Sequence, residues 1–349
     1  MKQSFLVSAA ALALSSTAVF AGGIERSSQS VGILFEEGRY AEFSFSTVSP
    51  KVSGVFAGAV PSGDMAPSYS NFSLGYKQDF GQNLSFALIL DQPIGADVAY
   101  PAGGAYPFNG ATATIDSHAV TGLLKYKFPS NVSLYGGLRA QELSASLALP
   151  SGGGPYALTV PSDTEFGYVL GVAYEKPEIA LRVALTYNSE ITHTLKDNGG
   201  SPFDVTIPKS WNLEFQSGVA ANTLVFGSVR WVEWKAFNVS PPEYPGNPLA
   251  DGKTNTTAYT LGIGRKFNEQ WSGAIVLGYE AAGDVPVGNL GPTDGYKSIG
   301  LAATYKVNNM KITGGIRYVD IGDATTTTIG SNFSGNSAIG VGVKIGFSF

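Results

Sequence analysis

Residues 336–349 decide the fold, and they read Asn-Ser-Ala-Ile-Gly-Val-Gly-Val-Lys-Ile-Gly-Phe-Ser-Phe. From Ser337 onward two kinds of residue alternate. One set is large and apolar (Ile339, Val341, Val343, Ile345, Phe347, Phe349), and the other is mostly small (Ala338, Gly340, Gly342, Lys344, Gly346, Ser348). Because successive side chains of a strand point to opposite faces, the pattern predicts a long strand with one wholly apolar side.

The chain ends on the aromatic residue Phe349, as bacterial outer-membrane barrels typically do. This resemblance indicates that the last strand closes a barrel and that its apolar side faces lipid. We therefore expect contacts with outer-membrane lipid, and with the barrel assembly machinery through this strand. A soluble sheet could also bury such a side, so a secreted or periplasmic β-protein is the alternative.

The composition supports a β-barrel. The 349 residues include 44 Gly, 17 Tyr and 20 Phe, but only 14% are charged. Outside residues 1–21, no run approaches the roughly 18 uncharged apolar residues of a membrane helix, so apolar residues are spread along the chain as a barrel requires. The formal charge of −5 argues against nucleic acid as a partner. Cysteine is absent, which suits passage through an oxidising periplasm.

Residues 1–21 have the features of a secretory signal peptide. Lys2 supplies a positive charge, an apolar stretch follows, and Val19-Phe20-Ala21 matches a cleavage site. We predict a mature chain that begins at Gly22 and resides in the outer membrane of a Gram-negative bacterium.

Short polar breaks and long loops alternate along the rest of the chain. Six breaks lie near residues 81–83, 129–131, 175–178, 221–223, 268–270 and 308–309. Seven longer stretches rich in Gly, Pro, Ser and Asp lie at 50–67, 92–112, 150–163, 196–207, 236–253, 283–294 and 322–335. They predict about fourteen antiparallel strands within residues 40–349, with short turns at the periplasmic end and loops outside. A propeller would show a similar period, but these hairpins share no repeated signature.

Aromatic residues gather beside the short turns. They are Phe80, Phe128, Tyr174, Phe267, Trp271 and Tyr305. Amphipathic rings sit best at the membrane interface, so we expect these residues to form a girdle at the periplasmic end.

Residues 22–39 precede the first predicted strand and show no strand alternation. They carry an apolar cluster that includes Ile33, Leu34 and Phe35. A barrel of this size is wider than its side chains can fill, so we predict that residues 22–39 form a short plug inside it. A disordered leader is the alternative.

In its order of features the chain resembles the FadL/TodX family of outer-membrane long-chain fatty acid and aromatic-hydrocarbon transporters. The features are the apolar segment before the first strand, Asp91-Gln92-Pro93-Ile94-Gly95, Pro208-Lys209-Ser210-Trp211, Trp231 and Trp234, and the terminal Phe349. The resemblance implies a fourteen-stranded barrel with an N-terminal hatch. The family's Asn-Pro-Ala hatch triplet is absent here and the segment is short, so the family's gating details do not transfer.

The resemblance also implies passive uptake of hydrophobic molecules, most of all long-chain fatty acids. The ligand would be captured among outer loops, enter the lumen, and leave past the hatch or sideways at the third strand. Pro93 cannot donate to a strand ladder and Gly95 adds flexibility, which favours a gate there. A proline at the edge of a loop is also an ordinary turn residue.

Candidate ligand-binding residues lie in the loops and in the lumen. The loop aromatics are Tyr100, Tyr106, Phe108, Tyr156 and Phe203, and Phe35 of the predicted plug is a further candidate. The alternation points Arg139, Arg182 and Arg317 into the lumen, because a charge facing lipid near mid-membrane costs roughly 2–4 kcal/mol. These cations could hold a carboxylate, or pair with lumen acids such as Glu142 and Glu214.

Nothing in the sequence indicates an enzyme. The two histidines, His118 and His193, lack a serine two residues on, and the adjacent hydroxyl residues point to the opposite face. We expect both histidines to be surface residues at the outer rim. No cluster has metal-ligand spacing, and no cofactor is expected. A diffusion porin for small polar solutes is the alternative function, but the low charge content of the chain argues against it.

Overall fold

The computed structural model describes residues 24–150, 155–246 and 248–349. The predicted signal peptide, residues 1–21, lies outside these residues. No described helix is long and apolar enough to cross a membrane.

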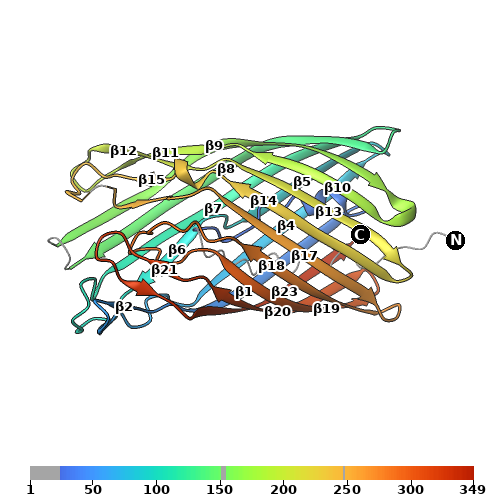
Figure 1. The fold of residues 1–349 in the computed structure, drawn as a ribbon. Coiled ribbons are helices and arrows are strands. Elements are labelled where there is room, and N and C mark those ends of the chain that lie inside the picture. Colours follow the sequence, from blue (N-terminus) through green and yellow to red (C-terminus); the bar gives the residue numbers. More distant parts are fainter. Residues whose placement is uncertain (1–23, 151–154, 247) are drawn as a thin grey trace.

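Tilted antiparallel strands form a closed barrel (Figure 1). The wall consists of β1 (Tyr40–Lys51), β4 (Tyr69–Phe80), β5 (Leu84–Asp91), β6 (Gly95–Ala99), β7 (Thr112–Lys127), β8 (Val132–Leu149), β9 (Tyr156–Lys176), β10 (Leu181–Asn188), β13 (Ser210–Ala220), β14 (Thr223–Val232), β17 (Thr256–Lys266), β18 (Trp271–Glu280), β19 (Tyr296–Val307), β20 (Met310–Ile321) and β23 (Asn336–Ser348). Because β5 and β6 both pair with β7, one beyond the other, they are two halves of one strand. The described wall therefore has fourteen strands, as predicted.

The last strand closes the barrel as its alternation predicted. β23 pairs with β1 and with β20, and the register between β23 and β1 runs from Tyr40 opposite Ser348 to Lys51 opposite Ser337. Ile339, Val341 and Phe347 point outward and are exposed. On the other side of β23, Lys344 turns inward and pairs with Glu42 of β1 at 2.8 Å.

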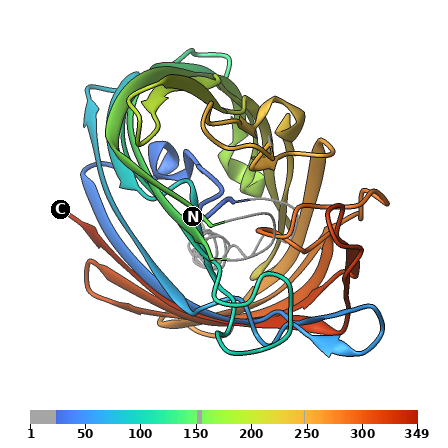
Figure 2. The ribbon, with the colours of Figure 1, turned by 90° about the vertical axis from the view of Figure 1, so that its left-hand side faces the viewer.

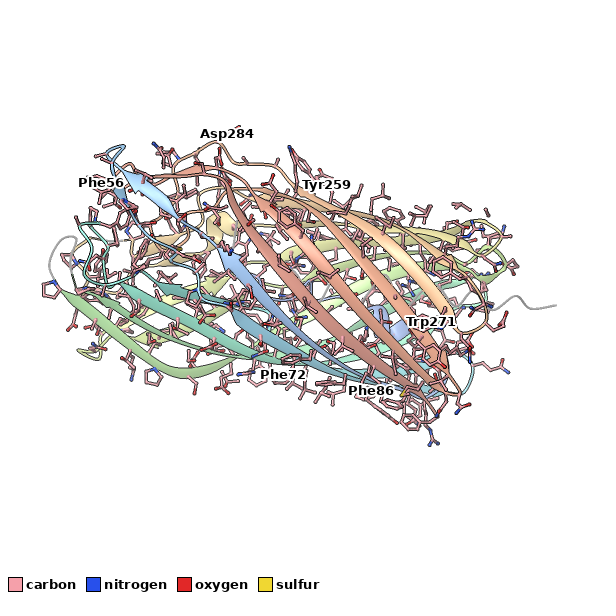
Figure 3. The ribbon with its side chains drawn as sticks, turned by 90° about the horizontal axis from the view of Figure 1, so that it is seen from below. Phe56, Phe72, Phe86, Tyr259, Trp271 and Asp284 are labelled. Atoms are coloured by element: carbon pink, nitrogen blue, oxygen red, sulfur yellow. The ribbon has the colours of Figure 1, made fainter. Side chains whose placement is uncertain are left out.

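The outward face of the wall is a continuous apolar band. Leu138 and Phe166 are 68% and 70% exposed, and Leu170, Leu261, Leu277 and Leu301 are each more than half exposed. Figure 3 shows such side chains, for example Phe72 and Tyr259, on the outside of the strands. Leaving this much apolar surface in water would be unfavourable at about 25 cal/mol per Å². The band therefore fits immersion in a bilayer.

The six predicted short turns are present at one end of the barrel, and the aromatic residues of the predicted girdle lie beside them. The rings of Trp271 and Tyr305 are in tilted contact with centroids 4.9 Å apart. Trp271 lies at that end in Figure 3, opposite Phe56 and Asp284 of the loops. One turn contains η3 (Pro177–Ile179).

The loop end of the barrel carries short elements. β11 (Ile191–Lys196) pairs with β12 (Pro202–Ile207), β15 (Asn238–Val239) pairs with β16 (Ala250–Asp251), and β2 (Gly54–Phe56), β3 (Val60–Pro61), β21 (Ala324–Thr325) and β22 (Asn332–Phe333) form a small sheet. η4 (Trp234–Ala236) follows β14. These elements gather at the left-hand end of Figure 1 and partly cover the barrel mouth.

Three predicted loops are shorter than expected. In the stretch 92–112, Gly95–Ala99 forms β6 of the wall. The stretch 150–163 was predicted as loop, but β9 begins at Tyr156 and pairs with β8 far beyond the apolar band. Likewise Pro202–Ile207 of the stretch 196–207 forms β12. In the last two stretches alternation continues, through Leu158 and Val160 of β9 and through Phe203 and Val205 of β12, and these side chains belong to the main buried cluster. Polar and Gly-rich composition obscured this pattern.

Two further predictions are wrong. Glu142 does not face the lumen, because it lies three residues after the inward Arg139 and is exposed on the outer face. His193 is not a surface residue. It lies on the buried face of β11 with its side chain 0% exposed, and its Nδ1 is 3.0 Å from Asp163 Oδ2. His118 is exposed, as predicted.

Residues 24–39 lie inside the barrel. This N-terminal segment contains η2 (Gly32–Phe35), which Figure 2 shows within the ring of strands. Val31, Ile33 and Leu34 pack against inward residues of β5, β7 and β8, namely Ala87, Leu123 and Tyr135. The apolar residues of the segment are therefore buried against the barrel wall.

Candidate functional site

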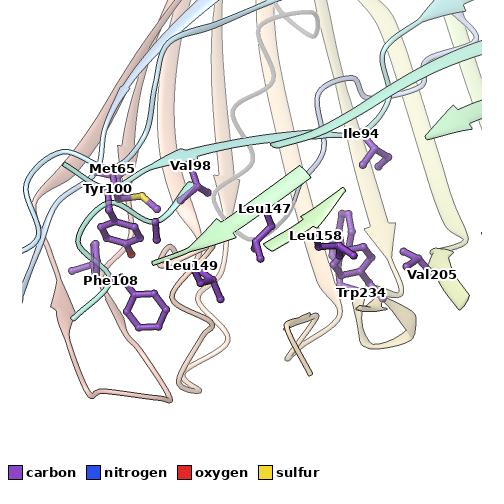
Figure 4. Packing of buried hydrophobic residues seen from close by; sticks show 14 of the residues in the cluster. Met65, Ile94, Val98, Tyr100, Phe108, Leu147, Leu149, Leu158, Val205 and Trp234 are labelled. Carbon is purple, nitrogen blue, oxygen red and sulfur yellow. The ribbon is translucent and has the colours of Figure 1, made fainter. Parts of the chain in front are cut away.

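An apolar cavity of about 280 Å³ lies at the loop end of the lumen. Its walls include Val52, Met65, Val98, Ile115, Leu147, Leu158, Trp234 and Phe237, which come from loops and from the outer halves of strands. Figure 4 shows several of these side chains, with Met65 and Val98 on one side and Leu158 and Trp234 on another. Concave, mostly apolar sites with a few polar groups are typical of ligand pockets.

The floor of the cavity is the start of the N-terminal segment. Ile24, Glu25 and Arg26 all line it. Arg230 of β14 holds the Glu25 carboxylate through its Nε, 2.9 Å from Oε1, and through its Nη2. The same guanidinium donates from Nη1 to Asn212 Oδ1 at 2.6 Å and to Ser210 Oγ at 3.0 Å. Both partners of the ion pair are almost fully buried, so this attachment is shielded from solvent.

Six further contacts attach the N-terminal segment around the wall. Ser27 donates to Asp91 Oδ2 at 2.6 Å, Asn212 to the Ser28 carbonyl at 2.9 Å, Arg139 to Gln29 Oε1 at 2.6 Å and Ser30 to Glu214 Oε1 at 2.6 Å. At the far end, Lys311 pairs with Glu36 at 2.9 Å and Lys77 donates to the Glu36 carbonyl at 2.6 Å. Polar anchors therefore follow the segment from one end to the other.

The wall is interrupted at residues 92–94, between β5 and β6. β4 pairs with β5 but not with β6, and side chains take over the hydrogen bonds of the missing ladder. Gln92 accepts from the Phe72 amide at 3.0 Å, and the Ser117 hydroxyl bonds the amide and the carbonyl of Ile94. A buried strand break is stable only when its backbone groups find such partners.

The N-terminal segment completes the interrupted wall. Glu25 and Ile94 form an antiparallel bridge, and the amide of Gly95 donates to the Ile24 carbonyl at 2.8 Å. Arg26 lies across the break, where it donates to the Gly95 carbonyl at 2.9 Å, pairs with Asp97 at 2.8 Å and stacks on the Tyr69 ring. A Cβ on Gly95 would be 2.9 Å from Arg26 Nε, so glycine permits this close approach.

The charges around the cavity are neutralised by one another. Glu25 pairs with Arg230, Arg26 with Asp97, and Lys253 with Asp251 at 2.7 Å. The Asp294 carboxylate accepts from the backbone amides of Gly283 and Asp284. Each cation that lines the described cavity is therefore already paired with a carboxylate.

Among the residues predicted to bind ligand or to gate, only Gly95 lines this cavity, and Pro93 adjoins it at the strand break. Tyr100, Tyr106 and Phe108 are buried in the loops, where the rings of Tyr100 and Tyr106 stack at 5.3 Å. Tyr100 donates to the Asn289 carbonyl at 2.6 Å, and burial raises the pKa of its phenol. Tyr156 packs on Tyr244, and Phe203 is buried on β12.

The predicted cations and Phe35 lie deeper in the lumen. Arg139 bonds Gln29 and Thr121, and Arg317 bonds Ser298 at 2.8 Å through Nη2. Phe35 lies near the other end of the N-terminal segment from the residues that line the cavity, with the charged groups of Lys125 and Arg182 each 4.6 Å from its ring centroid. Neither Lys125 nor Arg182 takes part in an ion pair among the described residues.

Sequence reasoning missed most of the residues that form the cavity. Arg26 and Glu25 were part of the predicted plug but were not singled out, although a charged pair in an otherwise apolar plug is a usable signal. Trp234 and Leu158 are 76 residues apart in the sequence and belong to η4 and β9 respectively, so no local pattern could bring them together.

No protein-family model and no curated protein matches the chain. Solved structures do. A FadL homologue of Pseudomonas aeruginosa is 14% identical with a TM-score of 0.76, and the match covers 97% of this chain and 98% of that one. The Pseudomonas putida toluene transporter TodX is 12% identical with a TM-score of 0.67, over 98% and 97% of the two chains. The Ralstonia pickettii toluene transporter TbuX is 14% identical with a TM-score of 0.61, over 90% of each. The chain thus has the fold of the FadL and TodX barrels, as its sequence resemblance predicted.

Proposed function

We propose that the protein is an outer-membrane channel for the passive uptake of hydrophobic molecules. The observation that carries this proposal is the apolar cavity at the loop end, closed on its inner side by residues 24–26. A diffusion porin needs an open aqueous path, whereas here an anchored segment lies in the lumen. The named functions of the similar structures, a FadL homologue and two toluene transporters, support the same conclusion.

We propose neutral, compact hydrocarbons as the preferred ligands. The cavity volume of about 280 Å³ is roughly twice that of an apolar cavity known to hold benzene, about 150 Å³. The paired charges around the cavity leave no cation for a carboxylate, and burying a carboxylate without a partner is costly. A single aromatic ring therefore suits the site better than the head group of a fatty acid.

Long-chain fatty acids, the ligand class that the sequence resemblance implied, are the second candidate. Lys125 and Arg182 beside Phe35 favour this class, because they are lumen cations outside the ion pairs of the described chain. An acyl chain would reach them only after passing the N-terminal segment.

The strand break is our proposed gate. Pro93 and Gly95 weaken the wall, and Arg26 fills the gap that they leave. Release through this gap requires the Arg26 side chain to leave the Gly95 carbonyl and the Tyr69 ring. We accordingly propose residues 22–39 as a plug domain and residues 40–349 as the barrel domain.

Uptake by whole cells tests the function. Cells that carry only this protein should accumulate labelled toluene faster than cells that lack it, with a smaller gain for labelled oleate. A Trp234→Asp variant, which places a charge in the cavity, should lose the gain, whereas Trp271→Phe at the girdle should keep it. Equal toluene and oleate uptake with and without the protein would contradict the proposal.

A further inference from the structure

Two carboxylates from different loops lie close together at the loop end of the barrel. Asp197 follows β11 in the β11–β12 hairpin, and Glu243 lies in the loop between β15 and β16. A Cβ on Gly199 would meet the Glu243 carboxylate and would be 3.5 Å from Asp197 Oδ1, so both carboxylates lie against the same glycine. Two negative charges at this separation repel each other and favour a compensating positive charge.

The Asp197 carboxylate is buried and only partly satisfied. Asp197 continues the inward alternation of His193 and Leu195, and it is 5% exposed. Its Oδ1 accepts from the Ser201 amide at 2.8 Å, whereas its buried Oδ2 has no hydrogen-bond partner in the part of the chain that the structure describes. Burying an ionised carboxylate without a partner is costly, so buried charges are normally paired or bound to a metal.

No cation of the described chain compensates the two carboxylates. Within residues 24–150, 155–246 and 248–349, neither Asp197 nor Glu243 takes part in an ion pair. Lys196 adjoins Asp197 but lies on the exposed face of β11, and Lys253 is paired with Asp251. The negative charge of the pair is therefore left for an external cation.

A neutral oxygen, the Tyr156 hydroxyl, lies beside the two carboxylates at the loop end of β9. This hydroxyl is buried and has no hydrogen-bond partner among the described residues. Partial burial and then the charges of Asp197 and Glu243 raise the pKa of the Tyr156 phenol, so it stays protonated at neutral pH. The Tyr156 ring packs on Tyr244, with centroids 4.9 Å apart.

We propose that Asp197 and Glu243 bind a calcium ion between the two loops, with the Tyr156 hydroxyl beside it. Oxygen-only, anionic ligand sets select hard cations, and Ca²⁺ accepts irregular geometries that Mg²⁺ does not. Backbone carbonyls and water would complete its coordination. With only two carboxylates, we expect a Kd of about 10⁻⁴–10⁻³ M, the range of extracellular calcium modules.

The ion would join the β11–β12 hairpin to a loop that lines the apolar cavity. Val239 and Leu249, at the two ends of that loop, both line the cavity, and the Leu249 amide donates to the Val239 carbonyl at 2.8 Å. Figure 1 shows β11, β12 and β15 together at the loop end. Calcium would therefore hold one side of the cavity in place. The site itself does not depend on the proposed uptake function.

Terbium(III) luminescence tests the site on the purified full-length barrel in detergent. Terbium replaces calcium in oxygen sites and becomes luminescent when an excited tyrosine lies close to it, as Tyr156 and Tyr244 would. The variants are Asp197→Asn and Glu243→Gln. Asp204→Asn is the matched control, because this exposed carboxylate on β12 only accepts from Thr194 Oγ1 at 2.9 Å, which an asparagine also does. The heat-modifiable barrel band confirms that each variant is folded.

We expect a saturable signal that calcium displaces, in the parent and in Asp204→Asn. Asp197→Asn and Glu243→Gln should each bind terbium at least about tenfold more weakly, since even the loss of a group that only supports a metal ligand costs that much. No saturable, calcium-displaceable signal from the parent, or equal affinity in the parent and both variants, would overturn the site. Neither result involves toluene uptake, so this inference and the proposed function fail separately.

Discussion

Replacing Arg230 by methionine should release the N-terminal segment from the wall. The substitution keeps an apolar side chain of similar length but removes the partner of Glu25, whose side chain is 4% exposed. Removing one partner of a buried ion pair costs about 3–5 kcal/mol, because the other charge is left uncompensated. Glu25 can escape this cost by moving into the aqueous lumen, so the penalty becomes a driving force for detachment.

A shift of about 4 kcal/mol corresponds to roughly a 1000-fold change in the ratio of detached to attached segment. This value is an upper bound, because Arg26, Ser30 and Glu36 still anchor the segment. The assay is the labelling rate of a Ser28→Cys reporter by a water-soluble thiol reagent. Ser28 contributes its backbone carbonyl to the anchoring, so its side chain is free for replacement.

Two comparisons give this prediction its control. Arg265→Met removes an exposed arginine on the outward face and should leave the labelling rate unchanged. Combining Arg230→Met with Glu25→Gln leaves no buried charge without a partner, and should bring the labelling rate back toward that of the parent. If Arg230→Met and Arg265→Met label at the same rate, the buried ion pair does not hold the segment.

Two other predictions concern the cavity and the wall. Trp234→Ala should enlarge the cavity at a stability cost of about 3–5 kcal/mol. The larger cavity should improve uptake of naphthalene relative to toluene. An unchanged ratio of naphthalene to toluene uptake would mean that Trp234 does not limit ligand size. Gly137→Val should disrupt the pairing of β7 with β8, because even a Cβ there would clash with the Gly122 carbonyl oxygen. Loss of the heat-modifiable barrel band in electrophoresis checks this, with Gly122→Val, whose Cβ position is open, as the control.

The strands were predictable because lipid imposes one rule on all of them. Side chains that face lipid must be apolar, so the alternation in β23 predicts from sequence alone which of its side chains face lipid and which face the lumen. The same rule correctly predicted that Arg139 and Arg317 face the lumen. It could also have excluded Glu142 from the lumen, since a spacing of three residues from Arg139 reverses the face.

No lipid contact constrains the side chains of the outer loops, and the prediction that His193 is a surface residue was wrong there. His193 lies between Ile191 and Leu195 at a spacing of two, so the inward alternation of β11 was present in the sequence. Its burial depends on packing against β9, where Asp163 provides the partner. Contacts between segments that lie 30 residues apart leave no local pattern.

The cavity could not be predicted for the same reason. Its residues come from many strands and loops. The aromatic loop residues that were predicted to bind ligand, such as Tyr100 and Phe108, pack on one another instead. The polar anchors of residues 24–39 were equally hidden. Glu25 can pair with Arg230, and Arg26 with Asp97, only in the closed barrel.

The most direct test of the whole account is the ion conductance of the purified protein in a planar bilayer, measured with and without residues 22–39. The intact chain should show a closed trace with brief openings, and the shortened chain a large and steady conductance. A steady conductance from the intact chain, or the same trace from both, would contradict a barrel whose lumen is blocked by its own N-terminal segment.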